Sequence, residues 1–360
     1  MAFYCTGSYC FIYLIVVGES WSARASFTHN FRIIYLVRQS LFSHPFNMPE
    51  PSEHAFPYFC PYAFFHTHLF AYFFFIFNLS ECLEYQQYHF PCVSDEQSPN
   101  KFIRKLACAQ SELDDRISEG KPALKKEFPH MALIGCLDET TVKWVAGGSL
   151  ISDRYILTAA HVLNHNKYGI TRYALLGTMT RNIRDGLMYN IIKHLPHTLY
   201  DKNEKYNDIA LMMLDRPVSL SEHIRPICLP MVDVKLGRFR MVSGWGRTGV
   251  DQEPSKELLK TSVNILDGSQ CKDTIDSQLL TYGWQHDTMI CAGDSNRKGK
   301  DTCEGDSGGP LQVYMDDLNC TYVIEGVVSF GPSCGKGNPA VYTRVEAYLD
   351  WIVKNVWPDG

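Results

Sequence analysis

From Phe128 onward, short runs of strand-forming residues alternate with turns rich in glycine, proline and aspartate. Many short strands separated by turns are typical of antiparallel barrels and sandwiches. The pattern therefore predicts an all-β protein. The clearest runs are MALIGCL (131–137), KWVAGGSLIS (143–152), YILTAA (155–160), DIALMML (208–214), VIEGVVSF (323–330) and AVYTRV (340–345).

The end of the chain departs from this pattern. The segment 345–356 (VEAYLDWIVKNV) has a helical period that places four apolar side chains on one face. We therefore expect a C-terminal helix that packs on the β core through this face. The four residues are Tyr348, Leu349, Ile352 and Val356.

The first 80 residues have a composition unlike the rest of the chain, because they hold 23 of its 46 Phe, Tyr and Trp residues. An apolar run over 11–17, followed by Ser22 and Ala23, resembles a secretory signal near residues 1–23, although no Lys or Arg precedes it. The stretch 54–80 contains His and Pro, and its uninterrupted part, 69–77, is shorter than the ~20 residues that cross a membrane. We expect residues 1–80 to be a poorly ordered leader or translated non-coding sequence, and no membrane anchor.

Residues 81–116 are polar and read as a propeptide or linker, with a short helical piece near 101–113. The 360-residue chain carries a net charge of −5 and no block of Lys or Arg. A nucleic-acid partner is not expected, since nucleic-acid binding requires a basic surface.

Thirteen cysteines are spread along the chain, and none forms a CxxC pair. Spacing of this kind does not fit a zinc site and is typical of disulfides formed in an oxidising compartment. We therefore expect a secreted, extracellular protein without a metal or other cofactor. The odd count leaves at least one thiol unpaired or bonded to another chain. Asn78 and Asn319 match the acceptor pattern for N-glycosylation.

Three short motifs contain the residue types of nucleophilic catalysis. They are TAAH with His161, NDIAL with Asp208 and GDSGGP with Ser307. A serine hydroxyl is a weak nucleophile at neutral pH, and it requires a base within hydrogen-bond reach and a carboxylate that fixes the base's tautomer. Each motif alone is ordinary, but the three together, in this order, indicate a hydrolytic site.

Small residues surround Ser307. Gly305, Gly308 and Gly309 allow the backbone to turn sharply and to bring N–H groups close to a developing oxyanion. We expect the amides of Gly305 and Ser307 to form this oxyanion hole.

These motifs, in this order, resemble the trypsin/chymotrypsin family of serine proteases over residues 117–360. The resemblance implies two packed six-stranded antiparallel β-barrels with the active site in the cleft between them. It implies that His161 is the general base and then the general acid, that Asp208 orients it, and that Ser307 attacks the scissile carbonyl.

The same resemblance implies a primary specificity pocket. Asp301, six residues before Ser307, would form its floor and pair with Arg or Lys of the substrate. The backbone of Ser329 and Gly331 would line the pocket and pair with the substrate. Ala340 stands where trypsin-like enzymes commonly have glycine, so its methyl group is expected to narrow the pocket.

An activation switch is also implied. Cleavage between Arg116 and Ile117 would free an amino group that inserts and pairs with Asp306, thereby ordering the oxyanion loop. The segment beginning ISEG resembles the family's IVGG start, but Ser118 and Glu119 replace Val and Gly. Glu119 would bring a negative charge near the carboxylate and weaken the switch.

Three disulfides follow from the resemblance. Cys271–Cys291 and Cys303–Cys334 would brace the substrate pocket, and Cys108–Cys228 would keep the propeptide attached after activation. The family's cysteine pair beside the catalytic histidine is replaced by Ala146 and Val162. Losing both cysteines leaves no orphan thiol.

The sequences EFPHMALIG, ECLEY, NCTYVIEGVVSFG and YLDWI resemble the arthropod snake-like proteases, although an intact six-cysteine clip domain is not visible. The resemblance implies a secreted zymogen of an endopeptidase that cuts after Arg or Lys in an extracellular cascade. Its partners would be protein substrates such as another zymogen, an upstream activating protease and serpin-type inhibitors. The alternative is a catalytically weak homologue acting as a cofactor or binding protein, which the altered ISEG start favours.

Overall fold

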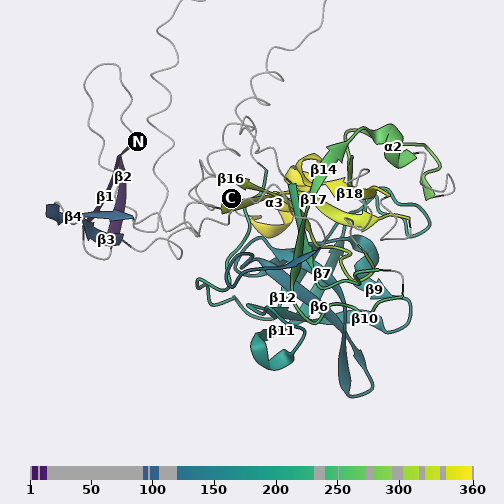
Figure 1. Cartoon of the computed structure of the whole chain (residues 1–360), viewed down its shortest axis with the longest axis horizontal. Helices are drawn as coiled ribbons and strands as arrows, with labels where there is room; N and C mark the ends of the chain where they lie inside the picture. The colour runs from purple at the N-terminus through teal and green to yellow at the C-terminus, as the bar shows by residue number, and fades with distance from the viewer. Residues whose placement is uncertain are drawn as a thin grey trace, which may run out of the picture. The chain divides into compact units, whose positions relative to one another are not determined.

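The computed structural model describes residues 2–6, 9–13, 92–95, 98–104, 120–230, 240–249, 251–272, 279–293, 303–315, 321–332 and 338–358. The chain divides into two units (Figure 1). One contains Met1–Ala71 and Phe90–Leu106, and the other contains Tyr72–His89 and Ala107–Gly360.

The first unit contains one antiparallel sheet, with strand order β2 (Tyr9–Tyr13), β1 (Ala2–Thr6), β4 (Ser98–Arg104) and β3 (Cys92–Asp95). Strand β4 overturns the predicted helical piece over residues 101–104, and residues 105–113 lie outside the described ranges. The reason is non-local pairing: the backbone of Phe102 pairs with Cys5 on one side and with Ser94 on the other. Two strand neighbours outweigh a weak local helical pattern.

The first barrel of the larger unit closes through six antiparallel strands. Its order is β6, β7, β8, β12, β11 and β10, and β10 pairs back with β6. A two-residue strand, β9 (Asn164–His165), pairs antiparallel with the start of β10. The bounds are β6 Met131–Asp138, β7 Thr141–Leu150, β8 Tyr155–Thr158, β10 Gly169–Leu176, β11 Leu187–Pro196 and β12 Ala210–Leu214.

The second barrel closes in the same way. Its order is β13, β14, β15, β18, β17 and β16, and β16 pairs back with β13. Strand β5 (Lys121–Pro122) adds to the edge of β14. The bounds are β13 Arg240–Gly244, β14 Leu259–Leu266, β15 Met289–Gly293, β16 Pro310–Met315, β17 Thr321–Phe330 and β18 Ala340–Arg344. The predicted fold class, two six-stranded antiparallel barrels, is confirmed.

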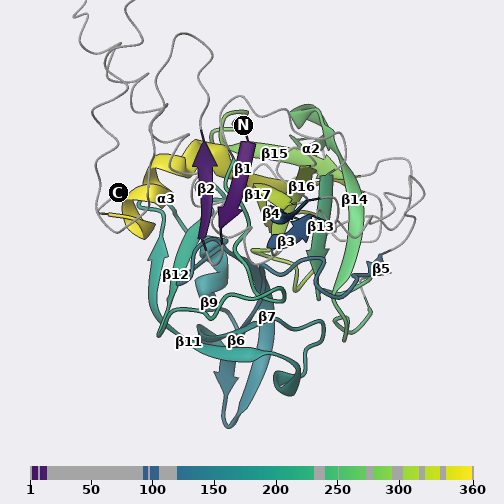
Figure 2. The same ribbon diagram turned by 90° about the vertical axis from the view of Figure 1, so that its left-hand side faces the viewer.

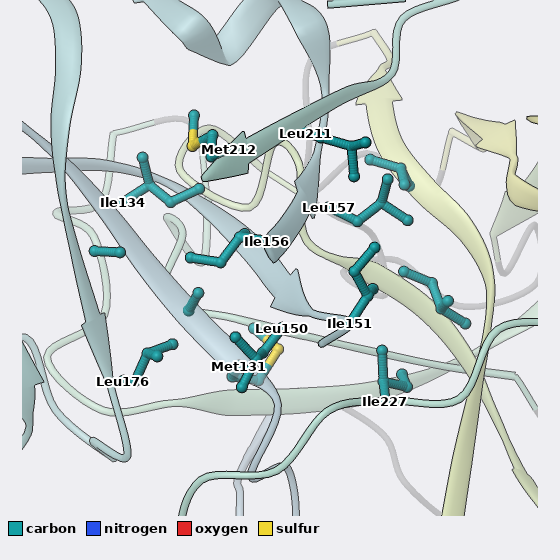
Figure 3. Close-up of a cluster of buried hydrophobic side chains, with 14 of the residues drawn as sticks. Met131, Ile134, Leu150, Ile151, Ile156, Leu157, Leu176, Leu211, Met212 and Ile227 are labelled. Atoms are coloured by element: carbon teal, nitrogen blue, oxygen red, sulfur yellow. The ribbon is translucent and has the colours of Figure 1, made fainter. Parts of the chain in front are cut away.

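Apolar side chains fill the first barrel, as Figure 3 shows for Ile134, Ile156 and Met212. The same buried cluster continues into the second barrel through Trp245 and Ile324, so the two barrels share a hydrophobic contact. This contact packs the first barrel, in teal, against the second, in green and yellow (Figure 2). A smaller cluster fills the second barrel itself.

The C-terminal helix is present as a 3₁₀ turn, Val345–Tyr348, continued by α3 (Leu349–Val356). Tyr348, Leu349, Ile352 and Val356 are all buried, as the helical period predicts. A second, short helix, α2 (Gly268–Lys272), also belongs to the unit that contains the two barrels (Figure 1). Within the described part of the chain, no helix is both long and apolar enough to cross a membrane.

Candidate active site

His161 and Asp208 come from two segments of the first barrel that are 47 residues apart in the chain. His161 lies in a 3₁₀ turn (Ala160–Leu163) just after β8, and Asp208 lies just before β12. The backbone N–H of His161 donates to Asp208 Oδ1 at 2.9 Å, and Nδ1 lies 2.7 Å from Oδ2. Because a carboxylate can only accept, Nδ1 carries the proton, and neutral His161 therefore presents an unprotonated Nε2.

The environment of Asp208 keeps its carboxyl group ionised. The side chain is fully buried, whereas the ring of His161 is 25% exposed. Burial alone would raise the pKa of Asp208, but the positive charge that His161 can carry and the hydrogen bonds from His161 and Ser329 lower the pKa below its ordinary value. Asp208 therefore stays charged and can stabilise a protonated His161.

Two hydroxyl groups of the second barrel complete the surroundings of Asp208. Ser329 Oγ donates to Asp208 Oδ2 at 2.5 Å, and Thr343 Oγ1 donates to the Asp208 carbonyl at 2.9 Å. From the sequence, only a backbone role is predicted for Ser329 and no role in the site for Thr343. No local pattern reveals these bonds, since Ser329 and Asp208 are 121 residues apart.

The loop that carries Ser307 requires glycine at two positions. Gly305 and Gly308 have φ angles of +100° and +80°, which L side chains rarely adopt. A Cβ atom at Gly308 would also overlap Thr158 and come within 2.5 Å of the Gly147 carbonyl oxygen. Gly308 thus lies directly against Thr158, the last residue of β8. Thr158 comes two residues before the turn that contains His161.

Strand β17 ties the Ser307 loop to Asp208. Gly308 N–H donates to the Val328 carbonyl, and Val328 N–H donates to the Gly309 carbonyl, each at 2.9 Å. The next residue, Ser329, binds Asp208. The TAAH, NDIAL and GDSGGP motifs therefore converge through the end of one strand. No hydrogen bond joins Ser307 Oγ to His161 Nε2 among the described residues, and such bonds are often long in unliganded sites.

The amides of Gly305 and Ser307 donate to no other group in the described ranges. In the same loop, the Ser307 carbonyl accepts from Gly147 N–H at 2.9 Å, and the Gly309 amide donates to the Asp306 carbonyl at 2.9 Å. Within the described ranges, nothing competes with a ligand for these two amides.

Asp306 lies between these two amides. The residue keeps some exposed surface, but its carboxyl group lies against Gly244 and Gly246, where a side chain at either position would overlap it. Its oxygens accept from Gly246 N–H at 2.8 Å and Cys303 N–H at 3.0 Å. Burial raises the pKa of Asp306 to about 6, because these hydrogen bonds and the charge of Arg181 only partly offset the loss of water.

Only part of the predicted pocket is described. Asp301 and Cys334 lie outside the described residues. Ala340 is buried, and a Cβ atom at Gly331 would lie 3.2 Å from its methyl group. The methyl group of Ala340 therefore lies close to Gly331, and the expected narrowing of the pocket stays a prediction.

Arg116 and Ile117 also lie outside the described residues. The segment that follows them is fixed to the second barrel. Lys121 pairs with Lys260 of β14, Ala123 N–H donates to the Leu258 carbonyl at 2.9 Å, and Glu127 forms an ion pair of 2.5 Å with Lys260.

A disulfide joins Cys271 of α2 to Cys291 of β15. Cys228 and Cys303 are also disulfide-bonded, and Cys108 lies outside the described residues. Cys136 is the one buried free thiol among the described cysteines. Ala146 and Val162, which replace the family's cysteine pair, are both buried in the first barrel's apolar cluster.

No group of three or more His, Cys, Asp or Glu side chains within the described ranges is arranged to bind a metal ion. The chemistry that this site offers is that of a hydroxyl, an imidazole, a carboxylate and backbone amides.

Comparison with known proteins places the chain in a family. The family model described as Trypsin matches residues 117–352. Phenoloxidase-activating factor 3 of Holotrichia diomphalia is 37% identical over 68% of this chain and 73% of its own length. Melanization protease 1 of Drosophila melanogaster is 39% identical over 72% and 70%, and the serine protease snk of the same species is 33% identical over 65% and 55%. The chain belongs to the trypsin family and is a serine endopeptidase.

Proposed function

We propose that this chain is the zymogen of a trypsin-like endopeptidase, with His161 as the base, Asp208 as its orienting carboxylate and Ser307 as the nucleophile. The convergence of the three motifs at the end of β17 is the observation that supports this assignment most strongly. His161 Nε2 would take the proton of Ser307 as its oxygen attacks the carbonyl carbon, and would then give it to the leaving amine.

In the proposed reaction, the free amides of Gly305 and Ser307 receive the oxyanion. Their fixed N–H groups need no reorganisation when charge develops on the carbonyl oxygen. Asp208 stabilises the imidazolium that forms at His161, because its own pKa is held low.

The proposed activation follows from the state of Asp306. Cleavage after Arg116 would free the Ile117 amine, and a cation reaching Asp306 would pair with a carboxylate that burial otherwise disfavours. The anchoring of residues 121–127 on β14 supports this proposal, since it holds the start of the domain on the second barrel.

For the substrate, we propose a chain cut after Arg or Lys held by Asp301, with Ser329, Gly331 and Ala340 forming the pocket walls. Two relatives are named a phenoloxidase-activating factor and a melanization protease. By extension we propose an extracellular cascade role, with another zymogen as substrate, an upstream protease as activator and serpin-type inhibitors. Secretion is supported by the disulfide Cys271–Cys291, since such bonds persist in oxidising compartments.

The test is controlled cleavage before Ile117. Residues 112–116 are replaced by an enteropeptidase site, the purified chain is cleaved, and turnover of an Arg-containing chromogenic peptide is measured. We expect activity only after cleavage, and its loss in Ser307→Ala. A cleaved wild-type chain without turnover, or turnover that survives Ser307→Ala, would contradict the proposal and favour the alternative of a weak homologue that acts by binding.

The pocket assignment is tested separately. Asp301→Ser should abolish the preference for Arg and Lys, whereas Asp287→Ser, which removes an exposed carboxylate, should leave it unchanged. Preference retained in Asp301→Ser would refute the pocket assignment alone.

A further inference from the structure

Arg181 joins the two barrels behind the Ser307 loop. It lies on the segment between β10 and β11 of the first barrel, and it is partly buried. Its Nη2 donates to the Trp144 carbonyl of β7 at 2.5 Å, and its Nη1 donates to the Trp245 carbonyl, just after β13 of the second barrel, at 3.0 Å. One guanidinium thus links two carbonyl groups from different barrels.

The Trp245–Gly246 peptide connects Arg181 to Asp306. Its carbonyl accepts from Arg181, and its N–H, contributed by Gly246, donates to Asp306 Oδ1 at 2.8 Å. The peptide unit is planar and trans, so its C=O and N–H point in opposite directions. Fixing the carbonyl on Arg181 therefore fixes the direction in which the N–H meets Asp306.

Electrostatics adds to this geometry. A cation on the carbonyl oxygen polarises the peptide and strengthens its N–H as a donor. The charge of Arg181 also acts on the Asp306 carboxyl itself and favours its ionised form. Both effects hold the carboxylate against Gly244 and Gly246.

From these contacts we infer that Arg181 is a positioning residue for the oxyanion hole, acting through the Trp245–Gly246 peptide and Asp306. The inference rests on the proposed function, since it assumes that the flanking amides of Gly305 and Ser307 receive the oxyanion. Arg181 touches neither substrate nor reacting atoms. It holds Asp306, and Asp306 holds the two amides on either side of it.

The backbone around Arg181 supports a fixed position. Its own N–H donates to the Lys256 carbonyl at 3.1 Å, and Leu258 N–H donates to the Met179 carbonyl at 2.7 Å. Trp245 Nε1 also donates to the Met179 carbonyl, at 3.3 Å. These hydrogen bonds hold the segment 179–181 on the second barrel without the guanidinium. Removing the guanidinium should therefore disturb the Trp245–Gly246 peptide more than the overall fold.

The experiment compares Arg181→Ala and Arg181→Lys with Arg184→Ala in the cleaved enzyme. Arg184 is exposed on the same connection, so its removal controls for loss of a charge there. We expect Arg181→Ala to lower kcat about tenfold or more with KM changed less than twofold, because the lost interactions act in the transition state. Arg181→Lys, which keeps the charge and can reach one carbonyl, should recover part of kcat, and Arg184→Ala should retain it.

Two inhibitors give a second readout. A peptide aldehyde forms a tetrahedral adduct with Ser307 Oγ and requires the oxyanion hole, whereas benzamidine fills only the specificity pocket. The inhibition constant of the aldehyde should rise with the fall in kcat of Arg181→Ala, and that of benzamidine should not. Equal kcat in Arg181→Ala and Arg184→Ala, or parallel loss of both inhibitors, would overturn the inference.

The controls keep the two proposals separate. A wild-type chain that is inactive after cleavage contradicts the proposed function itself. If Arg181→Ala does not fold, Arg181→Lys carries the test, because a lysine cannot make both carbonyl hydrogen bonds. A kcat equal to the wild type together with full aldehyde affinity in that variant would overturn the inference.

Discussion

The two carboxylates of the site, Asp208 and Asp306, are held in opposite ways. The Asp208 carboxylate accepts hydrogen bonds from the His161 ring, the His161 backbone N–H and the Ser329 hydroxyl, and its pKa is lowered. Asp306 meets two backbone N–H groups and no directly bonded cation among the described residues, and burial raises its pKa to about 6. One carboxylate has its charge compensated by its neighbours, and the other does not.

This difference separates the two halves of the site. In the half built on the first barrel, His161 and Asp208 are already hydrogen-bonded in the uncleaved chain. In the proposed mechanism, the half built on the second barrel, with Ser307 and its amides, depends on the Asp306 carboxylate, whose charge is costly until a cation arrives. A switch placed at Asp306 can thus control catalysis without disturbing the base.

The largest effect is expected at Asp208. Asp208→Asn keeps the size of the side chain but removes the charge and allows the wrong tautomer of His161. We expect kcat of the cleaved enzyme to fall by roughly 10⁴-fold. Steady-state turnover of the Arg peptide measures this effect, and Asp201→Asn, at an exposed carboxylate, serves as the control. A fall of less than tenfold would mean that Asp208 does not orient the base.

Asp306→Asn should have the next largest effect. The substitution removes the charge that the freed amine would meet and leaves one acceptor for two N–H donors. We expect kcat/KM after cleavage to fall by about 10²- to 10³-fold, the scale of losing an oxyanion donor. The uncleaved Asp306→Asn chain should be as inactive as the uncleaved wild type. Full activity of the cleaved Asp306→Asn variant would show that the two halves do not differ as described.

The opposite pKa shifts predict opposite dependence of stability on pH. The pKa of Asp306 is raised in the folded chain, so its ionisation destabilises the uncleaved fold as pH rises from about 4 to about 6. The pKa of Asp208 is lowered, so its stabilisation is present above its ordinary pKa and is lost as pH falls through the folded value.

Urea unfolding of the uncleaved chain at pH 4 to 7 checks this prediction. The free energy of unfolding of Asp306→Asn, relative to the wild type, should rise with pH up to about 6 by no more than ~3 kcal/mol, and then stay level. A flat difference for Asp306→Asn would show that its carboxyl group has an ordinary pKa.

Much of the fold follows from the sequence, because the short alternating runs define an antiparallel all-β chain. They do not distinguish a barrel from a sandwich, since closure depends on pairings such as β13 with β16 that join residues far apart in the chain. The same limitation explains β4, where local pattern predicts helix and non-local pairing gives a strand. The three motifs can be found from sequence because each is local. The contacts of Ser329 Oγ, Thr343 and Arg181 cannot be found in this way, because each side chain binds a group far away in the sequence.

The smallest effect is expected at the wall of the pocket. Ala340→Gly removes the methyl group that lies close to Gly331, and in the proposed site this would widen the specificity pocket. We expect KM for the Arg peptide to fall by a few-fold while kcat changes little, because the substitution affects binding more than the transition state. Unchanged KM would place the methyl group away from the bound side chain, and a change confined to kcat would link it to the oxyanion loop instead.

In the proposed mechanism, His161 activates Ser307 once the chain is cleaved. A fluorophosphonate tests it directly, since Ser307 Oγ would attack phosphorus, expel fluoride and keep a phosphonyl group that mass spectrometry locates. We predict one adduct per chain, on Ser307, forming rapidly in the cleaved wild type and at least a hundredfold more slowly in the uncleaved chain and in cleaved His161→Ala. Absence of an adduct on Ser307 in the cleaved chain, or labelling at the same rate in His161→Ala, would contradict the claim.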